Sequence, residues 1–255
     1  MPLLHVEQLT HYFGGLRAVS DFNLGLHEGE VVGLIGPNGA GKTTVFNLIT
    51  GVYRPTRGRI RLDGKDLVGI QSCDIVSMGI ARTFQTIRLF RELSVLDNVR
   101  IGHFSQARYS VGAALFRSGP FRREEERVRE KAYELLETFN LARYASSPAK
   151  ALPYGEQRRL EIARALASHP KILLLDEPAA GMNPNEIDRL LETIAWLKDR
   201  FGLTILLIEH QMRVVMGICE RILVLDFGET IAEGTPDEIR TNPRVLEAYL
   251  GKEAS

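Results

Sequence analysis

Short apolar runs that alternate with amphipathic segments dominate the hydrophobic pattern of this chain. Three runs, at residues 31–35, 172–175 and 205–208, are apolar without interruption, as is typical of strands that are buried on both faces of a sheet. Segments with apolar residues at helical spacing lie between them. This order predicts an α/β fold with a largely parallel sheet.

The N-terminal part has a different pattern. Apolar and polar residues alternate at 4–7 and again at 21–26, which predicts antiparallel strands with one wet face, joined through a turn at Phe13-Gly14-Gly15. A further alternating segment, residues 59–62, ends at Asp63-Gly64, a strong hairpin signal. The pattern therefore predicts antiparallel β structure beside the parallel sheet.

The middle of the chain is mostly helical in pattern. Within residues 122–141, apolar side chains fall on one helical stripe, whereas residues 105–120 contain two glycines and a proline and predict a long loop or broken helix. We interpret residues 86–154 as an α-helical subdomain inserted into a core formed by residues 1–85 and 155–255.

The C-terminal part contains clear helix starts and one hairpin. Asn183-Pro184 and Thr235-Pro236 each place a capping residue before a proline, with a glutamate three residues after the cap. Asn242-Pro243 predicts a further short helix. Residues 221–225 and 230–232 flank a turn and predict a β-hairpin.

Composition narrows the possible functions. Lys+Arg and Asp+Glu are both 32 in a chain of 255 residues, so no overall basic field indicates nucleic-acid binding. Cys73 and Cys219 fit no metal or redox spacing, which favours a reducing cytosol. The pattern predicts neither a membrane span nor an export signal. We therefore expect any membrane role to act through a partner.

One stretch indicates a triphosphate site. It reads Gly36-Pro37-Asn38-Gly39-Ala40-Gly41-Lys42-Thr43-Thr44 and fits the phosphate-loop pattern G-x-x-x-x-G-K-[ST], between an apolar strand and a helical segment. Its glycines let backbone N–H groups point at phosphate oxygens, and the helix N-terminus adds partial positive charge. Lys42 is expected to reach the β- and γ-phosphates, and the Thr43 hydroxyl to bind Mg²⁺.

Hydrolysis needs further groups, and strand ends supply candidates. Asp176 and Glu177 follow a buried strand, where ligands of open α/β sheets gather. Asp176 suits binding of Mg²⁺, and Glu177 suits activation of a water molecule as general base. The alternative for both residues is that they only cap the turn after the strand. His210 follows another buried strand and either contacts the γ-phosphate or attacking water, or is a satisfied rim residue. Phe13 either stacks on an adenine or is a core residue at a strand end.

Together these motifs resemble the ATP-binding cassette (ABC) ATPases. The resemblance covers almost the whole chain and is carried by five ordered motifs: residues 36–44, Gln85, the turn at Gly155, residues 173–178 and His210. It implies a P-loop NTPase fold, with a RecA-like core, an antiparallel β lobe and an inserted α-helical subdomain. It also implies ATP and Mg²⁺ as cofactors, and two cassettes that close head to tail around the nucleotide.

The resemblance also implies residue roles. Gln85 joins Thr43 and Asp176 around Mg²⁺ and signals toward the membrane partner. Glu177 is then the general base, and His210 the γ-phosphate sensor. Phe13 matches the aromatic residue that stacks on adenine, which favours stacking over the core alternative.

The turn that meets the partner's ATP is Tyr154-Gly155-Glu156-Gln157 in this chain. Pro153 precedes it where the family usually has serine, and Asn183 stands where the family has an aspartate. Loss of one hydrogen bond to a charged group costs on the order of 1.5–3 kcal/mol. We therefore expect this signature to close weakly on the partner's site and the working dimer to be asymmetric.

Several segments resemble the branched-chain amino acid importers of bacteria in particular. They include residues 82–85, 154–162, 176–181 and the tail from 232 to 251, as well as the loop near 105–120. The resemblance implies a peripheral protein on the cytoplasmic face of the cell membrane, paired with a second, different ATPase, two permeases and, indirectly, an external binding protein. The chain alone could instead form homodimers.

Alternative functions stay open at this stage. The cargo could be another small solute such as urea or another amide, because the cassette does not touch it. A non-transport ABC ATPase is a second alternative, although such proteins usually carry tandem cassettes, coiled coils, basic patches or metal cysteines. A phosphotransferase is a third, but it gives no role to His210 or to the Gly155 turn.

Overall fold

The computed structural model describes residues 1–106 and 119–250 of the chain. It forms two compact units, residues 1–85 with 171–255 and residues 86–170, which are described separately below. The second unit extends past the expected boundary at residue 154, because α6 (Tyr154–Leu166) packs against α3 (Val95–Gly102). Most of the loop expected near 105–120 lies outside the described residues.

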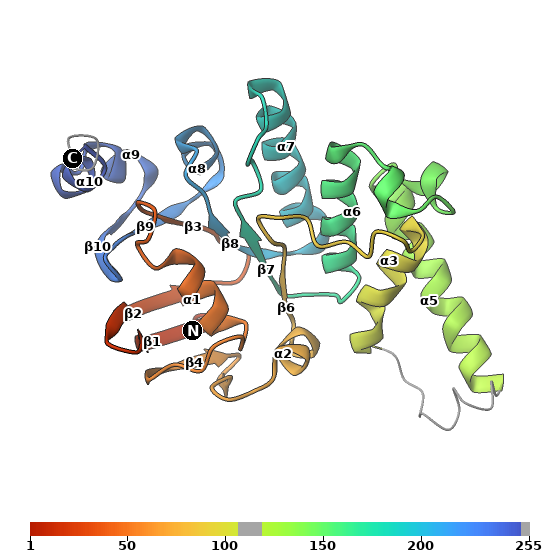
Figure 1. Ribbon diagram of the computed structural model, residues 1–255, viewed down its shortest axis with the longest axis horizontal. Coiled ribbons are helices and arrows are strands. Elements are labelled where there is room, and N and C mark those ends of the chain that lie inside the picture. Colours follow the sequence, from red (N-terminus) through yellow and green to blue (C-terminus); the bar gives the residue numbers. More distant parts are fainter. Residues whose placement is uncertain (107–118, 251–255) are drawn as a thin grey trace. The chain divides into compact units, whose positions relative to one another are not determined.

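A mixed sheet forms the centre of the first unit (Figure 1). Its strand order is β10 (Glu229–Gly234), β9 (Arg221–Asp226), β3 (Val31–Ile35), β8 (Thr204–Ile208), β7 (Ile172–Asp176) and β6 (Ile80–Arg82). All neighbouring pairs are parallel except β9 and β10. The α/β prediction and the C-terminal hairpin are confirmed. The three-residue edge strand β6 is too short for its pattern to be recognised in the sequence.

The second sheet is antiparallel, as the N-terminal alternation predicts. Its order is β2 (Leu16–Leu26), β1 (Leu4–Phe13), β4 (Arg57–Leu62) and β5 (Lys65–Asp66). Leu4 pairs with Leu26 and Phe13 with Leu16, so the turn lies at Gly14-Gly15.

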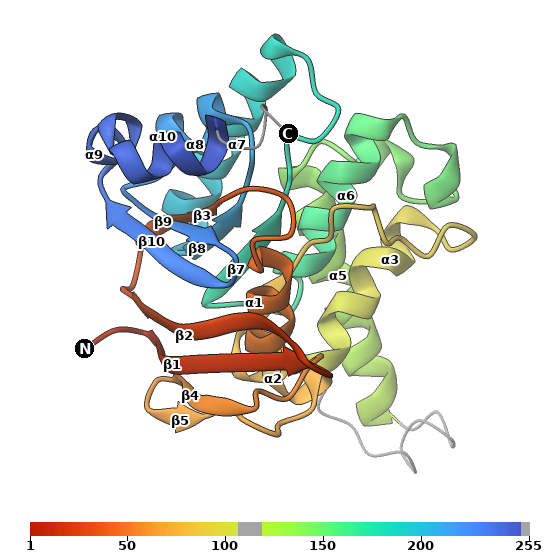
Figure 2. The same cartoon turned by 60° about the vertical axis from the view of Figure 1, so that its left-hand side comes forward.

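Helix α1 (Lys42–Ile49) lies between the two sheets, and α7 (Pro184–Phe201) and α8 (Met212–Ile218) lie beyond the parallel sheet (Figures 1 and 2). One hydrophobic core joins α1 to both sheets, through Val45, Phe46, Leu48 and Ile49 of the helix. The core fixes the helix that follows the phosphate loop against β3 and its neighbours.

Capping boxes define where two helices of this unit begin. Asn183 accepts the N–H groups of Asn185 and Glu186 and forms a full capping box for α7. Thr235 accepts a hydrogen bond from the Glu238 N–H and forms a capping box for α9 (Pro236–Thr241). Helix α10 (Pro243–Leu250) follows. Helix α2 (Ser72–Met78) precedes β6. Capping alone thus accounts for Asn183 where the family has an aspartate.

The regular elements in the described part of the second unit are helices, apart from an isolated bridge between Ser94 and Pro148. It contains α3, α5 (Gly119–Thr138), α6 and short 3₁₀ turns at His103–Gln106, Ala142–Tyr144 and Ala149–Ala151. Val128, Ala132, Leu136 and Phe139 are buried and Leu135 half-buried, as the apolar stripe predicts.

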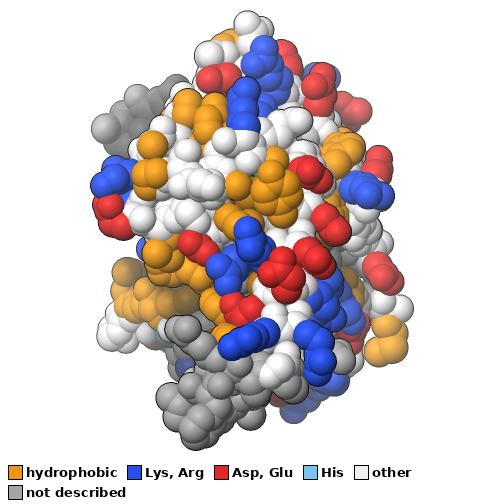
Figure 3. All heavy atoms as spheres, turned by 90° about the vertical axis from the view of Figure 1, so that its right-hand side faces the viewer, with side chains coloured by type: hydrophobic (Ala, Val, Ile, Leu, Met, Phe, Trp, Pro, Cys, Tyr) orange, Lys and Arg blue, Asp and Glu red, His pale blue; other side chains and the backbone are white. Residues whose placement is uncertain are grey.

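Charged side chains of both signs are interspersed on the face of the molecule in Figure 3. In the helical unit, Arg100 bridges Asp97 and Glu125, and Arg127 contacts Glu124. None of the described helices has the length and apolar character needed to cross a bilayer.

Candidate functional site

Two glycines of the phosphate loop, Gly36 and Gly41, occupy positions that leave no space for a side chain. Gly36 has φ 145°, and a Cβ there would lie 2.0 Å from the Leu225 carbonyl oxygen. Gly41 has φ 103°, and a Cβ there would lie 2.5 Å from the Ala18 carbonyl oxygen. The backbone conformation and the neighbouring strands therefore both require glycine.

The start of α1 leaves its first-turn N–H groups without a side-chain cap, because its N-cap residue is Gly41. No acidic residue lies in the first turn. Lys42 is buried, and its Nζ donates to the carbonyl oxygens of Gly36 at 2.6 Å and Pro37 at 2.9 Å. Thr43 is exposed. A positive helix terminus and an ammonium group thus face a loop that can accommodate an anion.

The β9–β10 hairpin supports this loop from outside. The Gly228 N–H donates to the Ala40 carbonyl at 2.9 Å, and the Gly228 carbonyl accepts the Ser20 N–H at 2.8 Å. Gly228 has φ 82°, and a Cβ there would lie 2.7 Å from the Ala18 carbonyl oxygen. The sequence marks Gly228 only as a turn residue, because its contacts come from segments far away in the chain.

Asp176, at the end of β7, forms a buried ion pair. Its Oδ2 accepts a hydrogen bond from Arg82 Nη2 at 2.7 Å, and only 6% of the Arg82 side chain and 7% of the Asp176 side chain are exposed. Arg82 Nη1 donates to Asn47 of α1 at 2.7 Å. The guanidinium also lies over the rings of Phe46 and Phe84.

Arg82 therefore ties the edge strand β6 to α1 and to the end of β7. Sequence reasoning gave no role to Arg82 or Asn47. The segment Arg82-Thr83-Phe84-Gln85 can be recognised in the sequence, but its partner cannot. Asp176, which pairs with Arg82, lies 94 residues further along the chain.

Glu177, Gln85 and His210 come together in space. Gln85 Nε2 donates to Glu177 Oε2 at 2.6 Å, and the His210 Nδ1 lies 3.8 Å from the same oxygen. Glu177 has φ 46°, a left-handed conformation that is costly for a residue other than glycine. The surrounding structure must stabilise that conformation, which is a frequent property of functional residues.

Phe13 lies at the end of β1 and is 43% exposed. Its ring contacts His11 and Tyr53 edge-on, with centroid distances of 4.7 and 5.2 Å. This aromatic group is partly open to solvent, so Phe13 is neither a core residue nor isolated. Its stacking on adenine stays a prediction.

The Tyr154-Gly155-Glu156-Gln157 turn opens α6 in the second unit, with Pro153 as its N-cap residue. Tyr154 is 53% exposed, and a Cβ at Gly155 would meet no atom within 4 Å. Gln157 Nε2 donates to the Leu152 carbonyl at 2.8 Å. Pro153 has no hydroxyl, so the first turn of α6 has no side-chain cap.

Comparison with known proteins identifies the family. The family described as ABC transporter matches residues 19–180, which include the phosphate loop, Gln85, Asp176 and Glu177. The chain belongs to the ABC transporter family. It is therefore an ATP-binding cassette ATPase with the P-loop NTPase fold. A second family, described as branched-chain amino acid ATP-binding cassette transporter, matches residues 229–255.

This ABC ATPase is 49% identical to BraF of Pseudomonas aeruginosa, a high-affinity branched-chain amino acid transport ATP-binding protein, over 98% of each chain. It is equally similar to LivG of Escherichia coli K12, which has the same description and the same coverage. The solved ADP conformation of MJ1267, an ATP-binding cassette of an ABC transporter, superposes with a TM-score of 0.85 at 34% identity, over 98% of this chain and 99% of that one.

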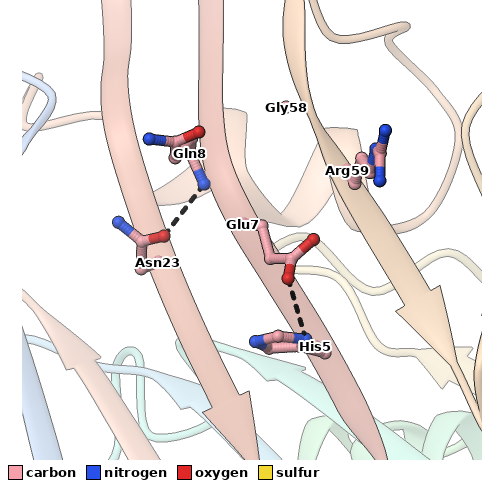
Figure 4. A pocket seen from close by; sticks show the side chains of 6 residues that line it. All are labelled: His5, Glu7, Gln8, Asn23, Gly58 and Arg59. Atoms are coloured by element: carbon pink, nitrogen blue, oxygen red, sulfur yellow. Dashed lines mark hydrogen bonds and ion pairs between the residues drawn. The ribbon is translucent and has the colours of Figure 1, made fainter.

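A polar cavity of about 600 Å³ lies on the antiparallel sheet of the ABC ATPase, away from these motifs (Figure 4). It is lined by His5, Glu7, Gln8, Asn23, Gly58 and Arg59. The cavity follows from an irregularity in the pairing of β1 with β4 after Glu7, where Gln8 has φ 48°. None of its lining residues belongs to the phosphate loop or to a strand end of the parallel sheet.

Proposed function

We propose that this chain binds and hydrolyses ATP as the energising subunit of a membrane importer for branched-chain amino acids. The observation that carries the proposal is the phosphate loop, with its buried Lys42 and uncapped helix start, in the same compact unit as Asp176 and Glu177 at the end of β7. The match of the C-terminal segment to a branched-chain amino acid transporter family supports the cargo class.

ATP binding uses groups that are otherwise satisfied locally. The Lys42 ammonium, now bonded to the Gly36 and Pro37 carbonyls, turns to the β- and γ-phosphates when a triphosphate enters. The N–H groups of Gly39, Gly41 and the first turn of α1 bind the remaining phosphate oxygens. Pro37, Asn38, Ala40 and Thr44 complete the loop, and Phe13 stacks on the adenine.

Three oxygen donors suit Mg²⁺, which prefers hard oxygen ligands. They are the Thr43 hydroxyl, the Gln85 amide oxygen and the second carboxylate oxygen of Asp176, since Oδ2 is bonded to Arg82. When bound, Mg²⁺ neutralises developing charge on the phosphates.

Glu177 acts as general base on the attacking water, and His210 contacts the γ-phosphate. Their proximity supports a shared task, since His210 Nδ1 and Glu177 Oε2 are 3.8 Å apart. Gln85 Nε2 donates to Glu177 Oε2, and because a carboxylate has about four acceptor sites, this bond orients Glu177 without preventing it from accepting a proton from water. Gln85 thereby couples its own segment to the protonation chemistry.

The second ATPase subunit closes over this site. The turn at Gly155 and the α6 N-terminus of each cassette meet the ATP of the other, and Pro153 makes this closure weaker for the present chain. Two integral permeases, supplied with solute by an external binding protein, place the complex on the cytoplasmic face of the cell membrane.

The experiment is a comparison of wild type with Glu177→Gln, assayed for ATP turnover and nucleotide retention. The amide cannot accept the water proton, so turnover should fall by 10²-fold or more while ATP stays bound in a closed dimer. Co-purification with integral membrane subunits and uptake of leucine, isoleucine and valine test the transport role. Brisk hydrolysis by Glu177→Gln removes this residue as the base.

A further inference from the structure

Glu209, the residue before His210, is a fully buried carboxylate with three backbone partners. Its Oε1 accepts the Ala179 N–H at 2.8 Å. Its Oε2 accepts the N–H groups of His210 at 2.9 Å and Gln211 at 3.0 Å. A buried carboxylate is costly unless its oxygens are hydrogen-bonded, so these contacts are what allow Glu209 to lie there.

These contacts join two loops that leave the sheet at the same edge. Pairing between β7 and β8 ends at Asp176 and Ile208, and one further bond runs from the Glu177 N–H to the Ile208 carbonyl at 2.9 Å. Beyond that point the ladder is replaced by the Glu209 side chain, with one oxygen for each loop. Gln211 Nε2 adds a second link, to the Ala179 carbonyl at 3.0 Å.

The two loops carry the groups assigned to hydrolysis. Glu177 belongs to the loop after β7, and His210 to the loop after β8. The His210 Nδ1 lies 3.8 Å from Glu177 Oε2 and also 3.8 Å from Glu209 Oε2. Because Glu177 has an unfavourable φ of 46°, its position depends on how firmly the residues that follow it are held.

We propose that Glu209 is a positioning residue for ATP hydrolysis, which holds the loop of Glu177 and the loop of His210 at a fixed separation. The inference rests on the proposed function. Only an ionised carboxylate offers acceptors to both loops at this position. A glutamine has one acceptor oxygen, and its NH₂ group would face N–H donors on the other side.

The test uses the full chain with Glu209→Gln, and Thr204→Val as matched control. Thr204 is also fully buried, lies at the opposite end of β8 and accepts the Gly29 N–H through its Oγ1 at 2.9 Å. Both variants therefore disturb side-chain hydrogen bonds of a buried residue, one at the start of β8 and one directly after its end. Measurements are kcat and KM for ATP, the Kd for ATP, and hydrogen exchange of individual amides.

In Glu209→Gln we expect kcat to fall by about 10–100-fold with KM and Kd changed by less than about twofold, since small misplacements of reacting groups cost this much. Exchange at the Ala179, His210 and Gln211 amides should accelerate, while the Glu177 amide stays protected by Ile208. Thr204→Val should keep wild-type kcat and wild-type exchange at these amides. If Glu209→Gln does not fold, Glu209→Asp, which retracts both oxygens by one methylene, should give the same pattern more weakly.

Two results would overturn the inference. The first is a kcat of Glu209→Gln within about twofold of the wild-type value. The second is a loss of both kcat and ATP affinity in Glu209→Gln that Thr204→Val reproduces. That second result would indicate that Glu209 has a structural role only. Glu177→Gln is assayed alongside. If Glu177→Gln is inactive and Glu209→Gln is normal, only the inference about Glu209 fails, whereas turnover by Glu177→Gln contradicts the proposed function itself.

Discussion

Removal of Arg82 tests how the buried charges of this site are balanced. Arg82→Met removes the guanidinium but keeps an unbranched apolar side chain that can pack near Phe46 and Phe84. It leaves the buried carboxylate of Asp176 without its cation. Breaking a buried pair in this way typically costs 3–5 kcal/mol, because the remaining charge stays desolvated.

Two further variants separate the charge effect from the loss of packing. Asn47→Ala removes one hydrogen bond of the charged Arg82 guanidinium but keeps the ion pair, so we expect a smaller loss, of about 1.5–3 kcal/mol. Arg82→Met combined with Asp176→Asn removes the unpaired charge. The double variant should therefore be more stable than Arg82→Met alone, with a coupling free energy of about 2 kcal/mol or more.

The assay is urea unfolding followed by Trp196 fluorescence. Trp196 is the one tryptophan of the chain and lies on α7, in the same compact unit as Arg82 and Asp176. Addition of ATP and Mg²⁺ should stabilise Arg82→Met more than wild type, because a cation then returns to Asp176. An Arg82→Met variant whose free energy of unfolding lies within about 1 kcal/mol of wild type would show that Asp176 does not depend on this cation, as would a double variant no more stable than Arg82→Met.

The other predictions concern the phosphate loop and a buried histidine. Lys42→Ala should weaken ATP binding by about 10–150-fold, which is the equivalent of one lost hydrogen bond to a charged group. Titration calorimetry measures the Kd, and an unchanged Kd would contradict the phosphate-binding role of Lys42. Burial, assisted by the positive charges of His169, Lys131 and Arg127, lowers the pKa of His103 from 6.5 to about 4. The folded chain thus binds fewer protons than the unfolded chain between these values, so stability is lost as the pH falls through this window, by about 2 kcal/mol between pH 7 and 5. Urea unfolding by far-UV circular dichroism should show this loss in wild type and a smaller one in His103→Leu; equal slopes would disprove it.

Local signals were sufficient for much of the fold. The buried strands 31–35, 172–176 and 204–208, the N-terminal hairpin and the capping boxes at Asn183 and Thr235 all depend on residues close together in the chain. The phosphate loop is equally local, because strand, glycine turn and helix follow one another without interruption. Hydrophobic periodicity and capping chemistry act over a few residues, so sequence alone reveals them.

The boundary between the two compact units could not be predicted from local sequence patterns. Helix α6 has the pattern of any amphipathic helix, and its packing against α3 is what assigns it to the helical unit that runs to residue 170. The short strand β6 is likewise defined by its neighbour β7 rather than by its own residues.

In the candidate site, Lys42, Asp176, Glu177 and His210 all stand in local sequence patterns that predict a role in ATP binding or hydrolysis. The contacts that hold these residues became visible only in the folded chain: Arg82 contacts Asp176, Gly228 contacts Ala40, and Glu209 joins the loops of Glu177 and His210. These supporting contacts join segments that are distant in the chain. Buried charged and polar groups need partners only once folding has removed them from water, so local sequence patterns do not indicate which residues will pair.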